Sequence, residues 1–387
     1  MTSGPSPAIL APMARRLQLA DYRSYAALDC AIEAQLVALT GENGAGKTNI
    51  LEALSLFSAG RGLRGAELAD CARRQGSGGF AVSIELVADG AVTQLGHGLE
   101  PASGEQSAAR RFRIDRAPVS SARAFADHLR PLWLTPAMDG LFAGPAGDRR
   151  RFLDRLALSL DAEHGARAAK LERALRNRNR LLAEETADAR WLDAAEREIA
   201  ALGVAVAAAR GETVLRLRAL IARERDDSSP FPWAQVSIEG ELERMIGEEP
   251  ALQVEDRYRA RLAAARRRDA AAGRTLEGPQ ASDLRVRHGP KDEAARACST
   301  GEQKALLAGL VLAHARLVAA TTGRAPLLLL DEVAAHFDPL RREALYAELA
   351  RIGGQVWMTG ADPEVFATLG GRAQLLRVFP GRVERTM

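Results

Sequence analysis

Eight residues near the N-terminus have the types and spacing of a loop that binds nucleotide phosphates. Residues 41–48 read Gly-Glu-Asn-Gly-Ala-Gly-Lys-Thr and fit G-x-x-x-x-G-K-[ST], between a strand-like segment (34–39) and a helix-like segment (49–57). In that context backbone N–H groups and the positive end of the helix face an anion. The pattern predicts that Lys47 reaches the β- and γ-phosphates of ATP and that Thr48 binds Mg²⁺. The residues expected to contact ATP are Gly41, Glu42, Asn43, Gly44, Ala45, Gly46, Lys47, Thr48 and Asn49.

A second segment that could do chemistry lies far downstream. Four leucines at 327–330 lead directly to Asp331 and Glu332, so residues 327–332 look like a Walker B strand. An apolar run of this kind is typical of a strand buried in a parallel sheet. Beside a phosphate loop, it predicts Asp331 as a ligand of Mg²⁺ and Glu332 as the general base for water, so that Glu332 and Lys47 are the catalytic residues. Taken alone, the segment would also fit a strand that ends in solvated acids.

The run Ser-Thr-Gly-Glu-Gln at 299–303 is similar to the S-x-G-x-Q signature of ABC-type ATPases. A serine hydroxyl and glycine amides at a helix N-terminus are suitable γ-phosphate ligands, so we expect Ser299, Gly301 and Gln303 to contact ATP. In the ABC arrangement this motif completes the site of a second chain, which implies an ATP-dependent homodimer. Asp338 stands at the place of the D-loop of such a dimer. The structural alternatives are a capping box at Ser299 and a helix N-cap at Asp338.

Composition limits the class of protein. The 387 residues are 47% hydrophobic and 27% charged, with a net charge of +3, as in ordinary soluble globular proteins. Cys30, Cys71 and Cys298 form no C-x-x-C pair, so neither a zinc site nor a disulfide framework is expected. Residues 1–16 lack a secretory signal pattern, and the apolar stretch 305–320 is too short to span a bilayer comfortably. We therefore expect a cytoplasmic protein with no membrane association.

Patterning along the chain predicts an α/β fold with a helical insertion. Two strands separated by residues 22–25 are expected within 16–40, and further strands at 80–86, 111–114 and 131–135. The strands up to residue 114 suggest a small antiparallel sheet. Residues 149–223 are almost unbroken helix formers, and 236–239 and 258–269 suggest a strand and a basic helix. From 278 onward helices alternate with the strands 326–330 and 355–359, which favours a mostly parallel sheet.

The expected fold class is an ABC-type P-loop ATPase head, with a mixed or parallel sheet, a small antiparallel sheet and an inserted helical lobe. We expect three parts. Residues 1–135 would form the N-terminal half of the head with the phosphate loop, and residues 136–274 the inserted helical lobe. Residues 275–387 would form the C-terminal half, with the signature, the Walker B strand and the D-loop.

Several further segments resemble the RecF family of bacterial recombination-repair ATPases, part of the SMC-like group. Residues 19–25 (Leu-Ala-Asp-Tyr-Arg-Ser-Tyr) are similar to its L-x-N-F-R-x-Y, and 44–53 to its G-A-G-K-T-N-[LI]-L-E-A. Residues 144–154 resemble its G-x-P-x-x-R-R-x-F-L-D block, with the proline one place early. Residues 175–182 resemble its L-x-x-R-N-x-L-L helix, and this block is the most specific to the family. The resemblance covers nearly the whole chain.

This resemblance implies a weak, DNA-stimulated ATPase that acts as a switch in recombinational repair and replication-fork maintenance. An ATP-induced dimer would clamp DNA near junctions of single and double strands, slow hydrolysis would release it, and RecA loading would be supported. The implied partners are DNA, a second copy of the chain, RecR and RecO. The chain departs from the family's G-P-H-R-D-D at 278–283 (Gly-Pro-Gln-Ala-Ser-Asp), and residues 357–360 offer no γ-phosphate-sensing histidine. We expect turnover below about 10 s⁻¹, a typical enzyme value.

Arginines supply the candidate DNA contacts, because no motif for reading bases is present and phosphate contacts suffice for binding. Each arginine would also fit an ordinary solvated surface. The candidates are Arg61, Arg64, Arg73, Arg74, Arg110, Arg111 and Arg113, with a further cluster at Arg266, Arg267 and Arg268.

Alternative functions are the nucleotide-binding subunit of an ABC transporter, a non-catalytic DNA-binding scaffold and an SMC-like anti-phage nuclease. The wide separation of Lys47 from Ser299 argues against the transporter, and the complete set of site residues argues against the scaffold. No metal-rich nuclease domain remains once the ATPase head is assigned.

Overall fold

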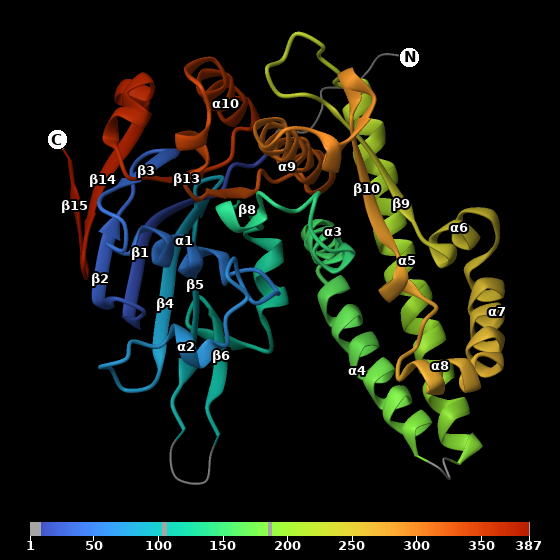
Figure 1. Cartoon of the computed structure of the whole chain (residues 1–387). Helices are drawn as coiled ribbons and strands as arrows, with labels where there is room; N and C mark the ends of the chain where they lie inside the picture. The colour runs from blue at the N-terminus through green and yellow to red at the C-terminus, as the bar shows by residue number, and fades with distance from the viewer. Residues whose placement is uncertain (1–8, 103–106, 185–187, 387) are drawn as a thin grey trace. The chain divides into compact units, whose positions relative to one another are not determined.

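The structure is a computed structural model that describes residues 9–102, 107–184 and 188–386. Half of the N-terminal segment in which no signal pattern was found, residues 1–8, lies outside the described residues. The chain divides into two compact units, whose ribbons are drawn in Figure 1. The first unit consists of Met1–Asp139, Ser228–Phe231 and Leu307–Met387, and the second of Gly140–Asp227 and Pro232–Leu306.

An antiparallel sheet in the first unit has the strand order β2-β1-β4-β5-β6-β7. Side chains along β4 alternate between buried and more exposed positions, so one face of this sheet packs on the core and the other faces outward. The strands are β1 (Met13–Tyr22), β2 (Tyr25–Ala31), β4 (Phe80–Ala88), β5 (Ala91–Glu100), β6 (Ala109–Ile114) and β7 (Ala117–Val119).

A second sheet in the same unit has the order β15-β14-β3-β13-β12-β8, and all of its neighbouring pairs are parallel except β15 with β14. Every residue of β3, β8, β12 and β13 is buried, which explains their continuous apolar runs. The strands are β3 (Leu36–Thr40), β8 (Pro131–Leu134), β12 (Leu327–Leu330), β13 (Val356–Gly360), β14 (Ala373–Phe379) and β15 (Arg382–Arg385).

Helix α1 (Lys47–Ser55) contributes to one apolar cluster with the inner face of the antiparallel sheet and with the parallel strands. Ile50 and Leu54 of the helix belong to this cluster, as do Val82 of β4 and Trp357 of β13. The phosphate loop is therefore set between rigid elements. The other helices that lie wholly in this unit are α2 (Leu68–Cys71), α10 (Pro339–Ile352) and short 3₁₀ turns at Ala122–Asp127, Pro136–Met138, Val333–His336 and Pro363–Arg372.

Long helices dominate the second unit. Helices α4 and α5 run side by side in Figure 1, and α7 packs against α5 through a cluster that includes Leu171, Val204 and Tyr258. The helices are α3 (Ala146–Leu160), α4 (His164–Ala183), α5 (Ala189–Arg223), α6 (Glu241–Glu248), α7 (Ala251–Ala264) and α8 (Arg266–Ala272). A small antiparallel sheet has the order β11-β10-β9, with β9 (Ala234–Glu239), β10 (Asp283–His288) and β11 (Glu293–Ala294). Short 3₁₀ turns lie at Pro279–Ala281, Gly289–Lys291 and Ala295–Ala297.

The block at 278–283, where the family pattern is not kept, anchors elements of this unit. Arg149 of α3 donates to both carboxylate oxygens of Asp283 at 2.8 and 2.9 Å, and Arg210 of α5 donates to the Pro279 carbonyl at 2.6 Å. Arg210 also binds Asp154 bidentately, at 2.8 Å for each contact. Burial would raise the pKa of Asp154, but hydrogen bonds from His164 and Arg210 outweigh it and lower that pKa to about 2.

The second compact unit extends further toward the C-terminus than the helical lobe expected from sequence, which ended at residue 274. Strand β10 explains the difference, because it pairs with β9, and Asp283 on it holds Arg149 of α3. The expected basic helix at 258–269 is two helices, α7 and α8, separated at Ala265. The two strands predicted within 16–40 are three strands in the structure, β1, β2 and β3, and β3 belongs to a different sheet from β1 and β2.

Helix α9 (Thr300–Thr322) runs from the second unit into the first. Among the described residues it is the one helix long and apolar enough to cross a membrane by length and composition, with a mean hydropathy of 1.6. Of its apolar window, 72% is buried inside the protein, as in the core helix of a soluble protein.

Candidate nucleotide site

The loop at 41–46 joins the end of β3 to the start of α1, and two of its glycines are required by their surroundings. Gly41 has φ 146°, and a Cβ there would lie 2.4 Å from the Val378 carbonyl oxygen of β14. Gly46 has φ 112°, and a Cβ there would lie 2.8 Å from the Tyr25 hydroxyl. By contrast, nothing lies within 4 Å of a Cβ at Gly44, so this part of the loop borders open space.

The Lys47 side chain folds back onto the loop. Its Nζ donates to the carbonyl oxygens of Gly41 at 2.6 Å and Glu42 at 2.9 Å. Burial lowers the pKa of Lys47, and the negative charges of Glu332 and Asp331 offset that shift only in part. The lysine is thus held over the loop, beside the two acidic residues that were predicted from the Walker B pattern.

Thr48 and Asp331 are brought together from opposite ends of the sequence. The Thr48 hydroxyl donates to Asp331 Oδ1 at 2.9 Å and lies 3.1 Å from Oδ2. This contact follows from topology, because α1 begins at the carboxyl end of β3 and Asp331 follows the carboxyl end of the nearby strand β12. A hydroxyl and a carboxylate are the hard oxygen ligands that Mg²⁺ prefers, so the donor set fits the expected ion.

Glu332 has an unusual backbone conformation at this site. Its φ of 56° and ψ of 13° are left-handed, which is uncommon for a residue with a side chain and is often found where strain serves function. Its backbone N–H donates to the Thr359 hydroxyl at 2.9 Å. That hydroxyl in turn donates to Asp331 Oδ1 at 2.8 Å. The sequence pattern indicated Thr359 only as a position without histidine.

The turn between β1 and β2 also packs on the phosphate loop. The Tyr25 hydroxyl donates to the Gly46 carbonyl at 3.1 Å, and Asn49 Nδ2 donates to Ser24 Oγ at 3.0 Å. Arg23 binds Glu52 of α1 bidentately, at 2.6 and 2.7 Å. Residues 19–25 resemble a family segment, but their place at the site could not be predicted, because nothing in the sequence pattern shows which strands α1 packs against.

The signature residues lie in the second compact unit, and the capping box considered as an alternative is present there. Ser299 Oγ accepts from the Glu302 amide at 3.4 Å, and Glu302 Oε2 accepts from the Ser299 amide at 3.0 Å. Hydrogen bonds from Lys291 and Ser299 lower the pKa of Glu302 to about 2. Gln303 Nε2 donates to the Cys298 carbonyl at 2.8 Å, whereas a Cβ at Gly301 would meet nothing within 4 Å. Contact of these residues with ATP stays a prediction.

Asp338 is an N-cap, as the other structural alternative supposed. Its Oδ1 accepts from the Arg341 amide at 2.9 Å at the start of α10, and Pro339 follows it. A position at a dimer interface stays a prediction for this residue as well.

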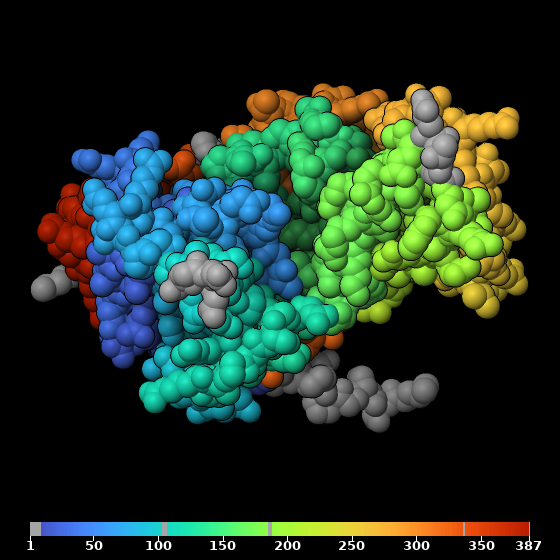
Figure 2. Space-filling view, turned by 90° about the horizontal axis from the view of Figure 1, so that it is seen from below, coloured from blue at the N-terminus to red at the C-terminus, as the bar shows by residue number. Residues whose placement is uncertain are grey.

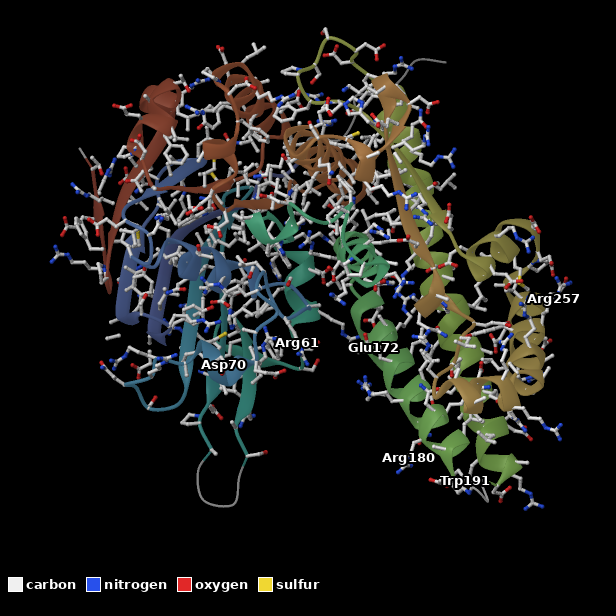
Figure 3. The ribbon with its side chains drawn as sticks, viewed as in Figure 1. Arg61, Asp70, Glu172, Arg180, Trp191 and Arg257 are labelled. Atoms are coloured by element: carbon white, nitrogen blue, oxygen red, sulfur yellow. The ribbon has the colours of Figure 1, made fainter. Side chains whose placement is uncertain are left out.

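Most of the candidate DNA-binding arginines already have partners. Arg64 donates to Asn49 at 2.8 Å and to the buried Glu52 at 3.0 Å, and Arg73 donates to Asp21 at 2.8 Å. Arg61 pairs with Glu67 at 2.8 Å on the surface, where Figure 3 labels it. Arg266 is bound to Glu196 and Asp193, and Arg268 to Glu277. Arg74 makes no hydrogen bond or ion pair with the described residues.

Arg110, Arg111 and Arg113 are on one strand but not on one face. Arg110 points to the core side of β6, donates to the Leu56 carbonyl at 2.9 Å and has a pKa lowered by burial. Arg111 and Arg113 face outward, where they line a groove of about 510 Å³ together with Arg116. Arg111 pairs with Glu100 at 2.7 Å, whereas Arg113 and Arg116 have no partner among the described residues.

Comparison with known proteins decides the family. The model of the RecF/RecN/SMC N-terminal domain matches residues 13–382. The chain is 54% identical to the DNA replication and repair protein RecF of Rhizobium meliloti, over 95% of this chain and 97% of that protein. The chain belongs to the RecF family. It is also 52% identical to the protein of the same name from Mesorhizobium japonicum, over 96% of this chain and 97% of the other.

Solved structures show the same fold. The recombination mediator protein RecF with ATPrS, described as part of the RecFOR pathway, superposes with a TM-score of 0.82 at 18% identity, over 97% of this chain and 99% of that one. The Smc head domain of Pyrococcus furiosus superposes with a TM-score of 0.52 at 15% identity, over 97% of this chain and 96% of that one. The fold is therefore that of an ABC-type ATPase head, as expected from the sequence.

Proposed function

We propose that this RecF-family protein is an ATP-dependent DNA-binding protein of DNA replication and recombinational repair. The observation that carries the proposal is the assembly of Lys47, Thr48, Asp331 and Glu332 where β3 and β12 end, in a chain 54% identical to a DNA replication and repair protein RecF. ATP and Mg²⁺ are the proposed cofactors, because the loop and the oxygen donors suit them.

Each of the four residues has a distinct task in the proposed reaction. The Lys47 ammonium, now held by the Gly41 and Glu42 carbonyls, would bind phosphate oxygens, and the amides of residues 44–48 would surround them. Thr48 and Asp331 would hold Mg²⁺, which supplies positive charge next to the β- and γ-phosphates. Glu332 would accept a proton from the attacking water. No histidine stands on β13, in keeping with slow, switch-like hydrolysis.

ATP would join two copies of the chain. The Ser299 and Gly301 end of α9 in one protomer would bind the γ-phosphate held by Lys47 of its partner, and Asp338 would lie near the interface. The open space around Gly301 supports this role, because an anion could approach the helix amides there. Closure with ATP and opening after hydrolysis would be a shift between two populations of dimer and monomer.

The closed dimer would hold DNA near junctions of single and double strands, and its release would follow hydrolysis. The outer face of the antiparallel sheet supports a phosphate contact, because Arg113 and Arg116 line the groove there and have no side-chain partner within the part of the chain that the structure describes. In Figure 2 the cyan-to-teal part of the chain that includes β5 and β6 lies at the surface. By family membership the protein partners would be RecR and RecO, and the outcome would be support of RecA loading in the cytoplasm.

Sedimentation of the Glu332→Gln variant tests the proposal. We expect this variant to be monomeric without nucleotide, dimeric with ATP and retained on gapped DNA only with ATP, because the bound triphosphate is not hydrolysed. Lys47→Ala in the same background serves as a control and should stay monomeric. A Glu332→Gln chain that binds gapped DNA equally well without ATP would contradict the proposal.

A further inference from the structure

Thr359 lies at the carboxyl end of β13, the strand between β3 and β12. It is 1% exposed, and its hydroxyl uses both of its hydrogen-bonding roles on the site. The hydroxyl donates to Asp331 Oδ1 at 2.8 Å and accepts from the Glu332 amide at 2.9 Å. One buried oxygen atom thus joins the side chain of the proposed metal ligand to the backbone of the proposed general base.

These two bonds act on groups that need support. The left-handed backbone of Glu332 is unfavourable for a residue with a Cβ and persists only where its surroundings hold it. The amide bond to Thr359 is such a restraint. Asp331 is mostly buried, and among the described residues its carboxylate accepts hydrogen bonds from two side chains, the hydroxyls of Thr359 and Thr48. If the Thr48 oxygen turns toward a cation, Thr359 is left as the donor that fixes the carboxylate.

We propose that Thr359 is a positioning residue that couples the orientation of Asp331 to that of Glu332 during ATP hydrolysis. The proposal rests on the proposed function, since it assigns a task to a residue of the same site. Thr359 does not reach the nucleotide in this account. It keeps the carboxylate of Asp331 and the backbone of Glu332 in one fixed relation, as outer-shell hydrogen bonds do in other metal sites.

Three variants separate this role from a purely structural one. Thr359→Val keeps the shape and removes the hydroxyl, whereas Thr359→Ser keeps the hydroxyl. Thr213→Val is the matched control, because Thr213 is a buried threonine of α5 in the second unit whose hydroxyl donates to the Ala209 carbonyl of its own helix. All three are made in the full-length chain, and their thermal unfolding is recorded first.

The expected result is a selective loss in Thr359→Val. Its kcat for ATP should fall about tenfold to a hundredfold, the usual effect of removing such a partner. Its affinity for a fluorescent ATP analogue in EDTA should stay within about threefold of wild type, since uniform binding is not touched. The gain in that affinity when Mg²⁺ is added should shrink by about tenfold. Thr359→Ser should restore both quantities, and Thr213→Val should change neither.

Several outcomes would overturn the proposal. These are a folded Thr359→Val with wild-type kcat and wild-type Mg²⁺ dependence, a folded Thr359→Ser no better than Thr359→Val, or an equal loss in Thr213→Val. If Thr359→Val does not fold, amide exchange in the wild-type protein replaces it. Protection of the Glu332 amide must then be high and must change with Mg²⁺ and nucleotide, and rapid exchange at that amide refutes the coupling.

A wild-type control distinguishes this inference from the proposed function. Wild-type chain that hydrolyses ATP, and loses that activity in Lys47→Ala, keeps the proposed function whatever Thr359 does. Wild-type chain that neither binds nor hydrolyses ATP removes the proposed function, and the inference with it.

Discussion

Among single residues, His97 is a buried titratable side chain on which stability should depend. Its ring on β5 packs edge to face on Phe57 with 4.8 Å between centroids, and also against Phe80. Burial lowers the pKa of His97 to about 3, and the nearby charge of Arg110 contributes. An unfolded histidine has a pKa of about 6.5, so the unfolded state binds the proton more readily. The stability that depends on neutral His97 is complete above pH 6.5 and is lost as the pH falls toward 3.

Burial of neutral His97 predicts a pH dependence of stability that one substitution removes. Between pH 7 and pH 4.5 the wild-type chain should lose about 2–3 kcal/mol more unfolding free energy than His97→Phe, since phenylalanine cannot take up the proton. Urea unfolding followed by tryptophan fluorescence at the two pH values measures the difference. His128→Phe, at a partly exposed histidine of the same unit, is the control. Equal pH dependence of wild type and His97→Phe would refute the burial argument.

Residue types and spacing could predict the phosphate loop and the Walker B acids because each lies in one short segment. The contact between Thr48 and Asp331 was implied by the shared function of the two segments. The bonds of Thr359 and the pairing of Arg23 with Glu52 could not be predicted, since they depend on which strands become neighbours. The position of Arg110 on the core face is likewise set by the register of β5 and β6, which pairs Arg110 with Leu99.

Among the secondary-structure elements, a buried arginine links helices of the second unit. Arg178 of α4 is 0% exposed and donates to Glu196 of α5 at 3.0 Å, to Asp269 of α8 at 2.8 Å and to Thr275 at 2.8 Å. Its removal would leave two buried carboxylates with fewer partners. Arg178→Ala should therefore lower the unfolding free energy by about 3–5 kcal/mol.

Denaturant unfolding of Arg178→Ala and of a control variant measures this loss of unfolding free energy. Arg176→Ala is the matched control two residues away on α4, because Arg176 is exposed and its pair with Glu172 is 3.8 Å long. The control should change stability by less than about 0.5 kcal/mol. Equal effects of the two substitutions would mean that the buried cluster contributes nothing specific to the fold.

The antiparallel sheet carries a prediction of its own. Arg113→Ala and Arg116→Ala should each weaken DNA binding and reduce its salt dependence by about one counterion, because both arginines line the outer groove and neither pairs with another described residue. Gly96 also lines the groove, and a Cβ there would lie 3.8 Å from the nearest atom, the Val82 carbonyl oxygen. Gly96→Leu should therefore fit the fold but occupy part of the groove, and it should also weaken binding. Fluorescence anisotropy with labelled gapped DNA and ATP measures each variant. Arg382→Ala on β15 is the control, and equal losses in all four would contradict a role for the groove.

Long runs of helix-forming residues could be predicted from sequence, whereas the glycine-interrupted strand β5 could not. Helices α3, α4 and α5 were expected within 149–223 from helix-forming residues. Strand β5 was not predicted, because Gly96 and Gly98 interrupt its pattern. Gly98 is required there, since a Cβ would lie 2.4 Å from the Phe80 carbonyl of the neighbouring strand β4. Such a requirement arises only after the strands have paired.

In the whole molecule, the residues proposed to bind ATP are divided between the two compact units. Lys47 and Asp331 share the first compact unit, whereas Ser299, Gly301 and Gln303 belong to the second. If ATP lies between two chains, each site takes its phosphate loop from one protomer and its signature from the other. Damage to the two motifs would then be complemented in a mixed dimer, in which one of the two sites is intact.

Mixing two inactive variants tests this arrangement most directly. Lys47→Ala removes the lysine proposed to bind phosphate, and Gly301→Arg alters the proposed signature while leaving the capping pair of Ser299 and Glu302 in place. Gly211→Arg, at an open helical glycine of α5, is the control for the added arginine and should stay active. The account predicts that Lys47→Ala and Gly301→Arg are each inactive alone and recover ATPase activity when mixed with ATP. No recovery in the mixture, with both variants folded, would contradict it.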